Sequence, residues 1–332
     1  MIETAVKESA EAGSALLEVR DLCVDYFTDK GAVRAVDRVS LSLGPGEFLG
    51  IVGESGCGKS TLLYAIARLL GAPAEISSGS IRFRGDDMVT MGEEDLRHIR
   101  WRNYSVVMQS AMNALNPVMT IGAQLSDAIL AHQRAPQREV RARSEEVMRL
   151  VGIDPVHLKS FPHQLSGGMR QRAMIAMALV FTPQLVIMDE PTSALDVVAQ
   201  RSLMLQIKEL QRKIGFAAIF VTHDMSLVSH FSDRLAVMYA GQVMEIGPTQ
   251  TVFREPRHPY SSGLLSSFPS IKGERLALQG IPGSPPDLAQ PPSGCRFHPR
   301  CPKVMAHCRT IEPLFHERMG VQVRCHLYAD GD

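Results

Sequence analysis

Gly53-Glu54-Ser55-Gly56-Cys57-Gly58-Lys59-Ser60-Thr61 is a glycine-rich loop that follows an apolar run, Phe48–Val52, and precedes a helical pattern over 62–70. Such a loop lets successive backbone N–H groups wrap around phosphate oxygens, and the helix dipole adds positive potential there. Lys59 can reach the β and γ phosphates, and the Ser60 hydroxyl is a ligand that Mg²⁺ accepts. The sequence predicts a nucleoside triphosphate site. A chance glycine-rich turn is the alternative, which the matching strand, spacing and helix disfavour.

Two carboxylates follow a second apolar run, Leu185–Met188. A buried parallel strand of this kind delivers the next residues to the carboxyl edge of a sheet, where a phosphate loop also lies. We expect Asp189 to hold Mg²⁺ through its water shell and Glu190 to polarise a water for in-line attack on the γ-phosphate. A helix N-cap is the competing interpretation of the pair. The phosphate loop earlier in the chain favours the catalytic one.

A histidine and a second phosphate-type turn complete the pattern. His223 follows the strand-like run Phe216–Val221, so it is expected at the same sheet edge, where it could hold the attacking water. A lone histidine there is otherwise more often a surface group. The run Leu165–Gln171 places a serine and two glycines before another helical stretch, which suits a second phosphate. One nucleotide site does not need two such turns. The second is therefore predicted to face the nucleotide of a partner subunit.

These motifs resemble those of the nucleotide-binding subunits of ABC transporters, over about residues 17–265. The loop resembles the Walker A motif, Leu185–Glu190 the Walker B strand, Leu165–Gln171 the signature, and Ser193-Ala194-Leu195-Asp196 the D-loop. The resemblance implies that Glu190, His223 and Gln109 are catalytic, and that Ser60, Gln109 and Asp189 hold Mg²⁺. It also implies ATP contacts from Tyr26, which would stack on adenine, and from Gly53, Glu54, Ser55, Gly56, Cys57, Gly58, Lys59, Ser60, Thr61, Ser166, Gly167, Gly168 and Asp196.

Segments outside the ATP motifs resemble one group within that family, the oligopeptide/dipeptide (peptide/nickel) importer ATPases. They are Asn113–Gly122, Arg257–Tyr260 with Leu264-Leu265, Ile281–Pro286 and Gly294–Pro302. The resemblance implies ATP hydrolysis that powers uptake of peptides, or alternatively of oligosaccharides, nickel or another small solute. It further implies a second ATPase subunit, generally a different chain, two membrane permease subunits and an extracytoplasmic solute-binding protein. The chain would then lie peripherally on the cytoplasmic face of the membrane.

Charge and composition bear on the remaining function classes. Lys plus Arg and Asp plus Glu number 35 each and are interspersed, so no basic stripe indicates a nucleic acid. A soluble ABC ATPase acting on ribosomes or DNA is the competing class. It is disfavoured because the chain has one Walker A loop, one signature and no long heptad run. An ATP-binding scaffold without hydrolysis is disfavoured by Glu190 and His223.

Cysteines gather near the end of the chain. Four of the six follow residue 290, namely Cys295, Cys301, Cys308 and Cys325, with five, six and sixteen residues between them. A disulfide framework is not expected in a cytoplasmic protein, and the short Cys-x₂₋₄-Cys knuckles of zinc ribbons do not occur. Loose spacings suit an iron–sulfur cluster, which the family resemblance also implies as 4Fe-4S; zinc and free thiols are the alternatives. His298, His307 and His326 are near enough in sequence to substitute as ligands.

The predicted organisation is an α/β P-loop ATPase with a small appendage. Residues 1–15 form a polar, flexible tail that lacks the apolar core of a signal peptide. The ABC ATPase domain covers 16–265, with an antiparallel β portion over about 16–52 and 79–83, a RecA-like core and a helical subdomain over about 109–165. A proline-rich linker leads into a cysteine-rich C-terminal extension over 266–332, which holds the predicted cluster.

Overall fold

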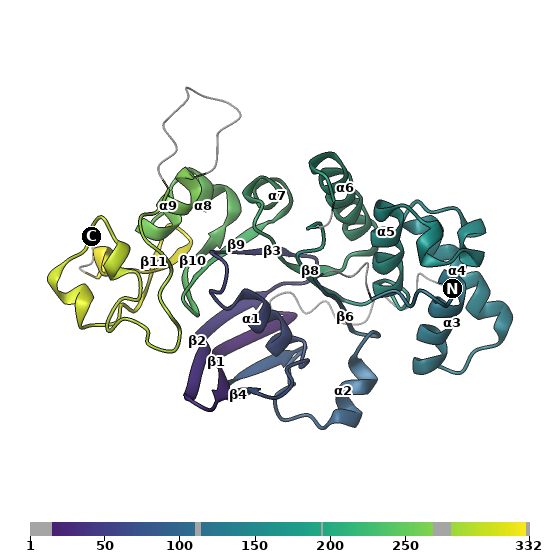
Figure 1. The fold of residues 1–332 in the computed structure, drawn as a ribbon, viewed down its shortest axis with the longest axis horizontal. Coiled ribbons are helices and arrows are strands. Elements are labelled where there is room, and N and C mark those ends of the chain that lie inside the picture. Colours follow the sequence, from purple (N-terminus) through teal and green to yellow (C-terminus); the bar gives the residue numbers. More distant parts are fainter. Residues whose placement is uncertain (1–14, 110–113, 194, 268–279, 330–332) are drawn as a thin grey trace.

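Two β-sheets, of four and eight strands, organise the described part of the chain (Figure 1). The computed structural model describes residues 15–109, 114–193, 195–267 and 280–329. The predicted tail up to residue 14, Asn113 of the importer-like segment and Ala194 of the D-loop motif lie outside the described residues. The smaller sheet is antiparallel, in the order β2-β1-β4-β5. Its strands are β1 (Leu17–Thr28), β2 (Gly31–Leu43), β4 (Ala74–Phe83) and β5 (Asp86–Asp87).

The larger sheet has the order β11-β12-β10-β9-β3-β8-β7-β6, and its centre is parallel. The parallel strands are β3 (Phe48–Val52), β6 (Tyr104–Val107), β7 (Leu185–Asp189), β8 (Ala217–Val221) and β9 (Arg234–Tyr239). Every residue of β3, β7 and β8 is buried, as expected for strands covered on both faces. The prediction that residues 48–52 belong to the antiparallel portion is therefore wrong. Their continuous apolar run suits a central parallel strand.

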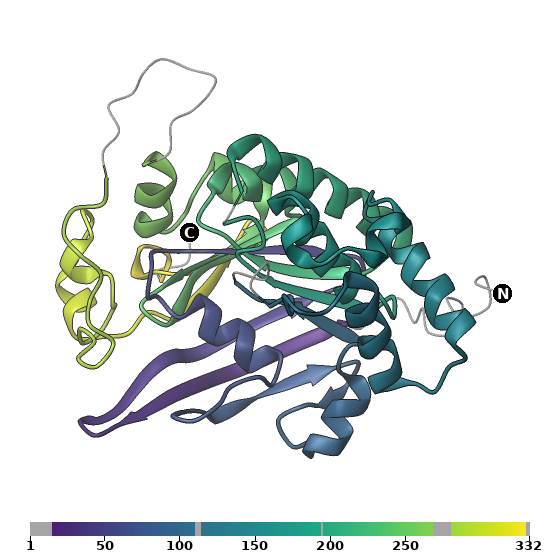
Figure 2. The same cartoon turned by 45° about the vertical axis from the view of Figure 1, so that its right-hand side comes forward.

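Helices cover both faces of the larger sheet, and the side chains of β3 alternate between the two resulting cores. Leu49 and Ile51 pack with α1 (Lys59–Ile66) and the smaller sheet. Phe48 and Val52 belong to the opposite core. That core is covered by α5 (Gly167–Ala178), α6 (Val197–Ile214) and α7 (Met225–Phe231). Figure 2 shows the hairpin of β1 and β2 below the larger sheet and these helices above it. The phosphate loop thus lies where the two sheets meet.

A helical lobe occupies one end of the molecule (Figure 1). It contains α3 (Ile121–His132), α4 (Gln137–Leu150) and two short 3₁₀ segments, η2 (Pro155–Lys159) and η3 (Pro162–Gln164). One face of α4 is buried at positions 140, 144, 147 and 148, the spacing of an amphipathic helix. A further helix, α2 (Glu93–Ile99), follows the smaller sheet. Within the described ranges, no helix is both long and apolar enough to span a membrane.

The C-terminal part adds strands to the same large sheet. After β10 (Gln242–Pro248), α8 (Thr249–Arg254) and α9 (Pro259–Ser266), the chain returns as β11 (Phe315–Arg318) and β12 (Val321–Arg324). Strand β12 pairs antiparallel with β10, and β11 pairs with β12. Three 3₁₀ turns, η4 (His298–Arg300), η5 (Ala306–Arg309) and η6 (His326–Tyr328), connect or follow these strands. Buried extension residues, among them Phe297 and Val321, belong to the same core cluster as Phe48 of β3. The extension therefore packs on the core of the larger sheet.

Candidate nucleotide site

The glycine-rich loop fits tightly between β3 and α1. Gly53 has φ +155°, and a Cβ there would lie under 3.0 Å from the carbonyl oxygen of Met238. Gly58 has φ +100°, and a Cβ there would meet the carbonyl of Ala35 at a similarly short distance. In both cases the obstacle is backbone, so a side chain cannot be accommodated by a rotamer change. The loop is thus held against the end of β9 and against β2.

Lys59 begins α1 and is almost completely buried. Its ammonium group donates hydrogen bonds to the carbonyl oxygens of Gly53, at 2.8 Å, and Glu54, at 2.9 Å. Gly58 occupies the N-cap position of α1 and provides no side-chain acceptor to the first turn. The start of α1 therefore has no side-chain cap, and it lies beside a lysine that is held on the loop, a combination that suits a phosphate group.

Two of the predicted magnesium ligands lie together. The Ser60 hydroxyl donates to Oδ1 of Asp189 at 3.1 Å, while Oδ2 of Asp189 is buried without a hydrogen-bond partner in the described protein. Burial raises the pKa of Asp189, and the Ser60 hydrogen bond partly opposes that rise. An unpaired buried carboxylate oxygen costs free energy that a hydrated divalent cation could recover. Ser60 and Asp189 therefore fit a Mg²⁺ ion.

Tyr64 is a residue of this site that the sequence analysis missed. It lies one helical turn after Ser60 on α1, beside Asp189, and burial raises its pKa to about 12. Residues four apart on a helix share a face, so the position of Ser60 was the signal that could have identified Tyr64.

Glu190 lies at the centre of a cluster drawn from three adjacent strands. Gln109 follows β6, Glu190 follows β7 and His223 follows β8. The Gln109 amide donates to Oε2 of Glu190 at 3.0 Å, and Nδ1 of His223 lies 3.5 Å from Oε1. Glu190 has φ +46°, and its N–H donates to the carbonyl of Val221. The structure thus brings the three predicted catalytic residues together. It places Gln109 on Glu190, and among the described residues no hydrogen bond joins Gln109 to Asp189.

Tyr26 lies near the end of β1, next to the glycine-rich loop. Its hydroxyl is 3.2 Å from the Thr61 hydroxyl on the first turn of α1. The side chain is partly exposed, and an aromatic ring is a group on which a flat base can stack. This position beside the loop is compatible with the predicted stacking on a base.

The signature and D-loop residues take a different position. Ser166 is the N-cap of α5 and accepts a hydrogen bond from the N–H of Met169, and Gln171 of the same helix donates to the carbonyl of Pro191. Asp196 caps α6 in the same way, through the N–H of Ala199. In the part of the chain that the structure describes, no hydrogen bond joins Ser166, Gly167 or Gly168 to the loop over 53–61. These residues are not assembled with the chain's own phosphate loop.

The four cysteines of the extension lie near one another. Cys295, Cys308 and Cys325 are buried and Cys301 is partly buried, and all four are free thiols. Burial raises the pKa of Cys295 to about 11, and the neighbouring thiols of the other three add to the rise. Within the described ranges, the metal-type ligand atoms that come within 4.8 Å of one another are those of His307, Cys308 and His326. The thiols are therefore neighbours without forming a tight single-ion cage.

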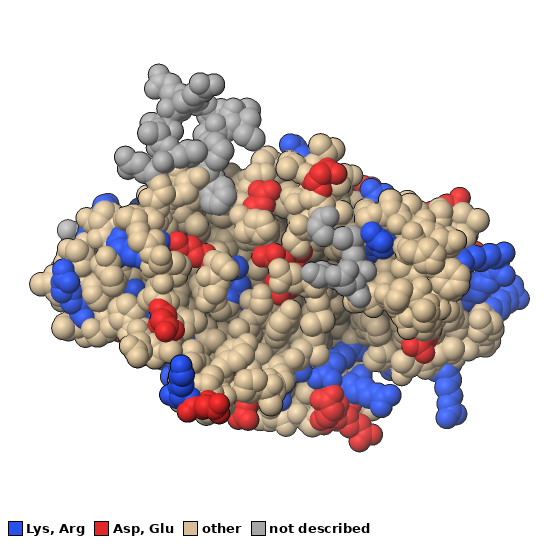
Figure 3. All heavy atoms as spheres, viewed as in Figure 1, with Lys and Arg blue, Asp and Glu red and all other residues tan. Residues whose placement is uncertain are grey.

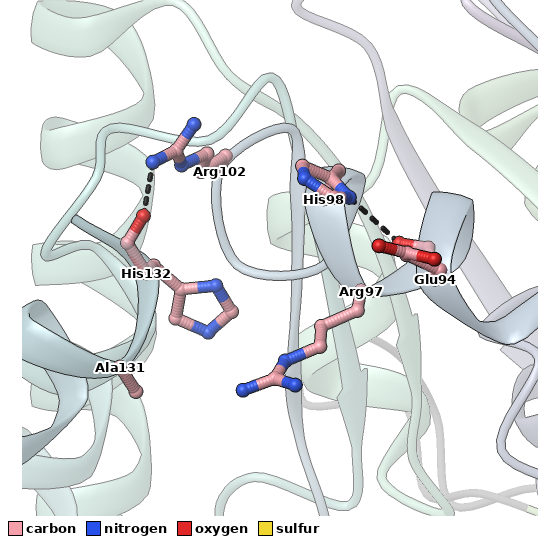
Figure 4. Close-up of a pocket in the computed structure, with 6 residues that line it drawn as sticks. All are labelled: Glu94, Arg97, His98, Arg102, Ala131 and His132. Atoms are coloured by element: carbon pink, nitrogen blue, oxygen red, sulfur yellow. Dashed lines mark hydrogen bonds between the residues drawn. The ribbon is translucent and has the colours of Figure 1, made fainter.

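A separate surface pocket lies away from these residues, between α2 and the end of α3 (Figure 4). It has a volume of about 270 Å³ and is lined by Glu94, Arg97, His98, Arg102, Ala131 and His132. The Arg102 guanidinium donates to the carbonyl of His132, and Nδ1 of His98 lies 2.8 Å from the carbonyl of Glu94. The pocket contains none of the predicted site residues.

Charges on the face shown in Figure 3 are mixed. Acidic and basic groups are scattered among the other residues of this face, and basic side chains lie at both ends and along the lower edge. No continuous basic stripe is visible on this face, which agrees with the equal numbers of acidic and basic residues.

Comparison with known protein families finds two models that match the chain. The model described as ABC transporter matches residues 36–193, and the model described as oligopeptide/dipeptide transporter, C-terminal region, matches residues 244–308.

Similar whole proteins include three transport ATP-binding proteins. The dipeptide transport ATP-binding protein DppD of Bacillus subtilis is 44% identical over 301 residues, which cover 90% of each chain. DppD of Haemophilus influenzae is 41% identical, covering 94% of this chain and 95% of that protein. The oligopeptide transport ATP-binding protein AppD of Bacillus subtilis is 42% identical, covering 96% and 98%.

Solved structures with a similar fold include two ABC cassettes. The dimeric bacterial ABC transporter cassette MJ0796 has a TM-score of 0.63 and 28% identity, covering 70% of this chain and 98% of that one. The same cassette has also been solved in a post-hydrolysis state bound to ADP and Pi. The cbiO1 protein of Clostridium perfringens, part of an ABC transporter complex, has a TM-score of 0.63 and 30% identity, covering 73% and 92%.

Proposed function

Because the chain belongs to the family of ABC transporter ATP-binding subunits and is an ATPase of that family, we propose that it powers the uptake of dipeptides or oligopeptides. Its similarity to DppD and AppD proteins extends over nine tenths of the chain or more and includes the C-terminal region. The observation that carries the ATPase proposal is the cluster of Gln109, Glu190 and His223 beside the Walker A loop. Residues that position a water are thus combined with residues that bind phosphate.

We assign phosphate binding to the Walker A loop and to Lys59. The loop N–H groups and the lysine ammonium would hold the β and γ phosphates, and the ring of Tyr26 would stack on adenine. Ser60 and Asp189 would hold Mg²⁺, the ion that neutralises charge on the phosphate oxygens. Tyr64, which is partly buried beside Asp189, would line the same part of the site.

We assign the activation of water to Glu190. A positive φ and the hydrogen bond from its N–H to Val221 fix its backbone, and Gln109 and His223 contact one carboxylate oxygen each. Both contacts restrict the rotamer of the carboxylate, so that it can accept a proton from a water held in line with the γ-phosphate. Gln109 and His223 are then available to bind that water or the γ-phosphate itself.

We propose that a second ATPase subunit completes each nucleotide site. Ser166, Gly167 and Gly168 at the start of α5, and Asp196 at the start of α6, would meet the nucleotide and the D-loop of that subunit. Val197 and Val198, which follow Asp196, are 76% and 80% exposed. Exposed valines next to the D-loop support an interface there. Family resemblance favours a different chain as the second subunit.

We further propose that the helical lobe couples ATP binding to two membrane permease subunits. Met108 directly precedes Gln109, and Val118 lies shortly before α3; the two residues are 45% and 79% exposed. Such exposure is expected where an apolar element of another chain docks. An extracytoplasmic solute-binding protein would deliver the peptide. The chain would lie peripherally on the cytoplasmic face of the membrane.

We propose that the cysteines of the extension hold a 4Fe-4S cluster. Thiolates are the ligands that such a cluster takes, and of the four cysteines Cys295, Cys308 and Cys325 are buried and Cys301 is partly buried. A cluster is larger than a single ion and can collect thiolates that are further apart. When bound, it would join turns that otherwise have little regular secondary structure.

The test is ATP turnover and peptide uptake by the complete transporter in proteoliposomes. Glu190→Gln should lower both at least about a hundredfold, because the general base is lost, while ATP binding changes less than about twofold. Glu209→Gln, at an exposed position on α6, serves as the control and should behave as the original protein. Unchanged turnover and uptake in Glu190→Gln would refute the assignment. Copurification with ribosomes instead of permease subunits would favour the soluble class.

A further inference from the structure

We propose that Arg300, in the cysteine-rich extension, is a positioning residue for the Walker A loop and acts through Glu54. Nη1 of Arg300 donates to Oε2 of Glu54 at 2.6 Å, and Nη2 donates to Oε1 at 2.9 Å. The two residues are 246 positions apart in the sequence. Their side chains are only 7% and 24% exposed. A bidentate ion pair of this kind fixes the relative orientation of the two side chains as well as their distance.

The rest of the Arg300 guanidinium is anchored in the same place. Nε donates to the carbonyl of Pro282, Nη2 also reaches that of Gly283, and Nη1 also reaches the hydroxyl of Tyr239. The pKa of Arg300 is raised, chiefly by the hydrogen bonds to Glu54. All the donors of the planar group are thus used, and a lysine could replace only some of them. The linker, the end of β9 and the Walker A loop meet at this one side chain.

Glu54 is held at three points, so the pair with Arg300 acts on a residue with little freedom. Its N–H donates to the hydroxyl of Tyr260 at 2.9 Å, and its carbonyl accepts from Lys59. Tyr260 belongs to a buried group of three rings, with centroids 4.6 to 5.3 Å apart, whose other members are Tyr239 and Phe297. Because Lys59 binds the carbonyl of Glu54, a shift of Glu54 would displace the lysine that the site uses for phosphate.

A second arginine of the extension supports the loop from the other side. Arg296 donates to the carbonyl of Ala240 and, at 2.7 Å, to Oδ2 of Asp37. Gly241, the next residue in that turn, donates its N–H to the carbonyl of Cys57 in the loop. Both arginines lie in the short segment between Cys295 and Cys301. A rearrangement of this segment would therefore move two supports of the Walker A loop together.

This inference rests on ATP turnover at the Walker A site, so the behaviour of the unmodified chain and of Glu190→Gln is measured first in the same transporter preparation. Arg300→Met and Glu54→Gln should each raise the KM for ATP about tenfold while kcat changes less than about twofold, because the loop is less well ordered before ATP binds. The double variant should be no worse than either single variant, because both remove one interaction. Arg300→Lys should recover part of the loss.

The control is Arg309→Met, which removes an exposed arginine of the same extension and should leave the KM unchanged. If Arg300→Met fails to fold, Arg300→Lys and Glu54→Gln still test the contact. An unchanged KM in folded Arg300→Met, or effects of the two single variants that simply add, would overturn the inference and leave the ATPase assignment intact. If the unmodified chain did not hydrolyse ATP, in contrast, that result would count against the proposed function.

Discussion

The ATP site and the cysteine-rich extension both gather residues that are distant in the sequence, but they do so by different means. At the ATP site, Gln109, Glu190 and His223 each follow one of three adjacent parallel strands, so the backbone ladder aligns them. In the extension, the four cysteines lie in irregular segments or in or beside short 3₁₀ turns, and side-chain contacts such as that between Arg300 and Glu54 align this region with the core. Substitutions at the ATP site should therefore affect that site alone. Substitutions in the extension should affect both the extension and the Walker A loop.

The largest effect is expected from Gly53→Ala, which tests whether backbone packing alone fixes the loop. The added methyl group would lie under 3.0 Å from the carbonyl oxygen of Met238. That carbonyl belongs to a buried strand, so the loop must move, and we expect ATP affinity to fall by more than about a hundredfold. Isothermal titration calorimetry measures the change.

The matched control is Gly56→Ala, also at positive φ, where a Cβ would meet no atom within 4 Å. In this variant the added methyl group causes only the backbone strain of a positive φ, about 1 kcal/mol, so the affinity for ATP should fall about fivefold. Equal losses in the two variants would show that strain, and not the Met238 carbonyl, limits the loop.

The next effect concerns acid sensitivity where the extension meets the core. His258 is 1% exposed, caps α9 by accepting from the N–H of Tyr260, and packs against Phe297. Burial lowers its pKa from 6.5 to about 3. Below about pH 6.5 the unfolded chain therefore binds a proton at His258, and the folded chain does not. The free energy of unfolding decreases as the pH falls from about 6.5 towards 3. Between pH 8 and pH 5 this amounts to about 2 kcal/mol.

His258→Asn keeps a capping oxygen and removes the titrating group, so its free energy of unfolding should fall about 2 kcal/mol less than that of the original protein between pH 8 and pH 5. Urea unfolding at several pH values gives both quantities. Glu245, whose pKa burial raises, remains in both proteins and cancels in the difference. The exposed His230→Asn is the control. An identical pH dependence in His258→Asn would show that His258 titrates normally.

The same contrast explains how much the sequence could predict. The Walker A loop, Asp189, Glu190 and His223 were predictable because each follows an apolar run, and strand alternation and edge geometry then decide their place. The pairing of β12 with β10 was not predictable, because a strand as short as β12 carries no signal for its partner in the sheet. The pairing of Arg300 with Glu54 was equally hidden. An arginine in an irregular segment can reach any carboxylate that the fold brings near.

A smaller effect should follow from Cys308→Ser, which tests the proposed cluster in the extension. Anaerobically purified protein should contain about four irons and four sulfides per chain, with a broad visible absorption band that dithionite bleaches. Cys308→Ser should lower the iron content about tenfold. Cys23→Ser, at a buried cysteine of β1, should leave it unchanged. Stoichiometric zinc, or no metal in the original protein, would contradict the cluster and leave the ATP site untouched.

The smallest effect is expected on thermal stability, when the charge of Asp189 is removed. Burial raises the pKa of Asp189, which means that the ionised carboxylate destabilises the folded chain when Mg²⁺ is absent. Asp189→Asn removes that charge, so in Mg²⁺-free buffer above the raised pKa it should increase Tm by about 2 °C, although ATP hydrolysis is lost. As the pH falls through the raised pKa towards 3.8, Asp189 takes up its own proton and the gain should disappear.

Thermal unfolding across this pH range, with exposed Asp127→Asn as the control, measures the gain. A higher Tm in Asp189→Asn would mean that the Asp189 carboxylate serves Mg²⁺ binding and lowers the stability of the fold. In the Arg300–Glu54 pair, by contrast, charge and packing both stabilise the fold. A lower Tm in Asp189→Asn at every pH would mean that the Ser60 and Tyr64 contacts already compensate the buried charge. The site would then be preorganised by protein groups alone.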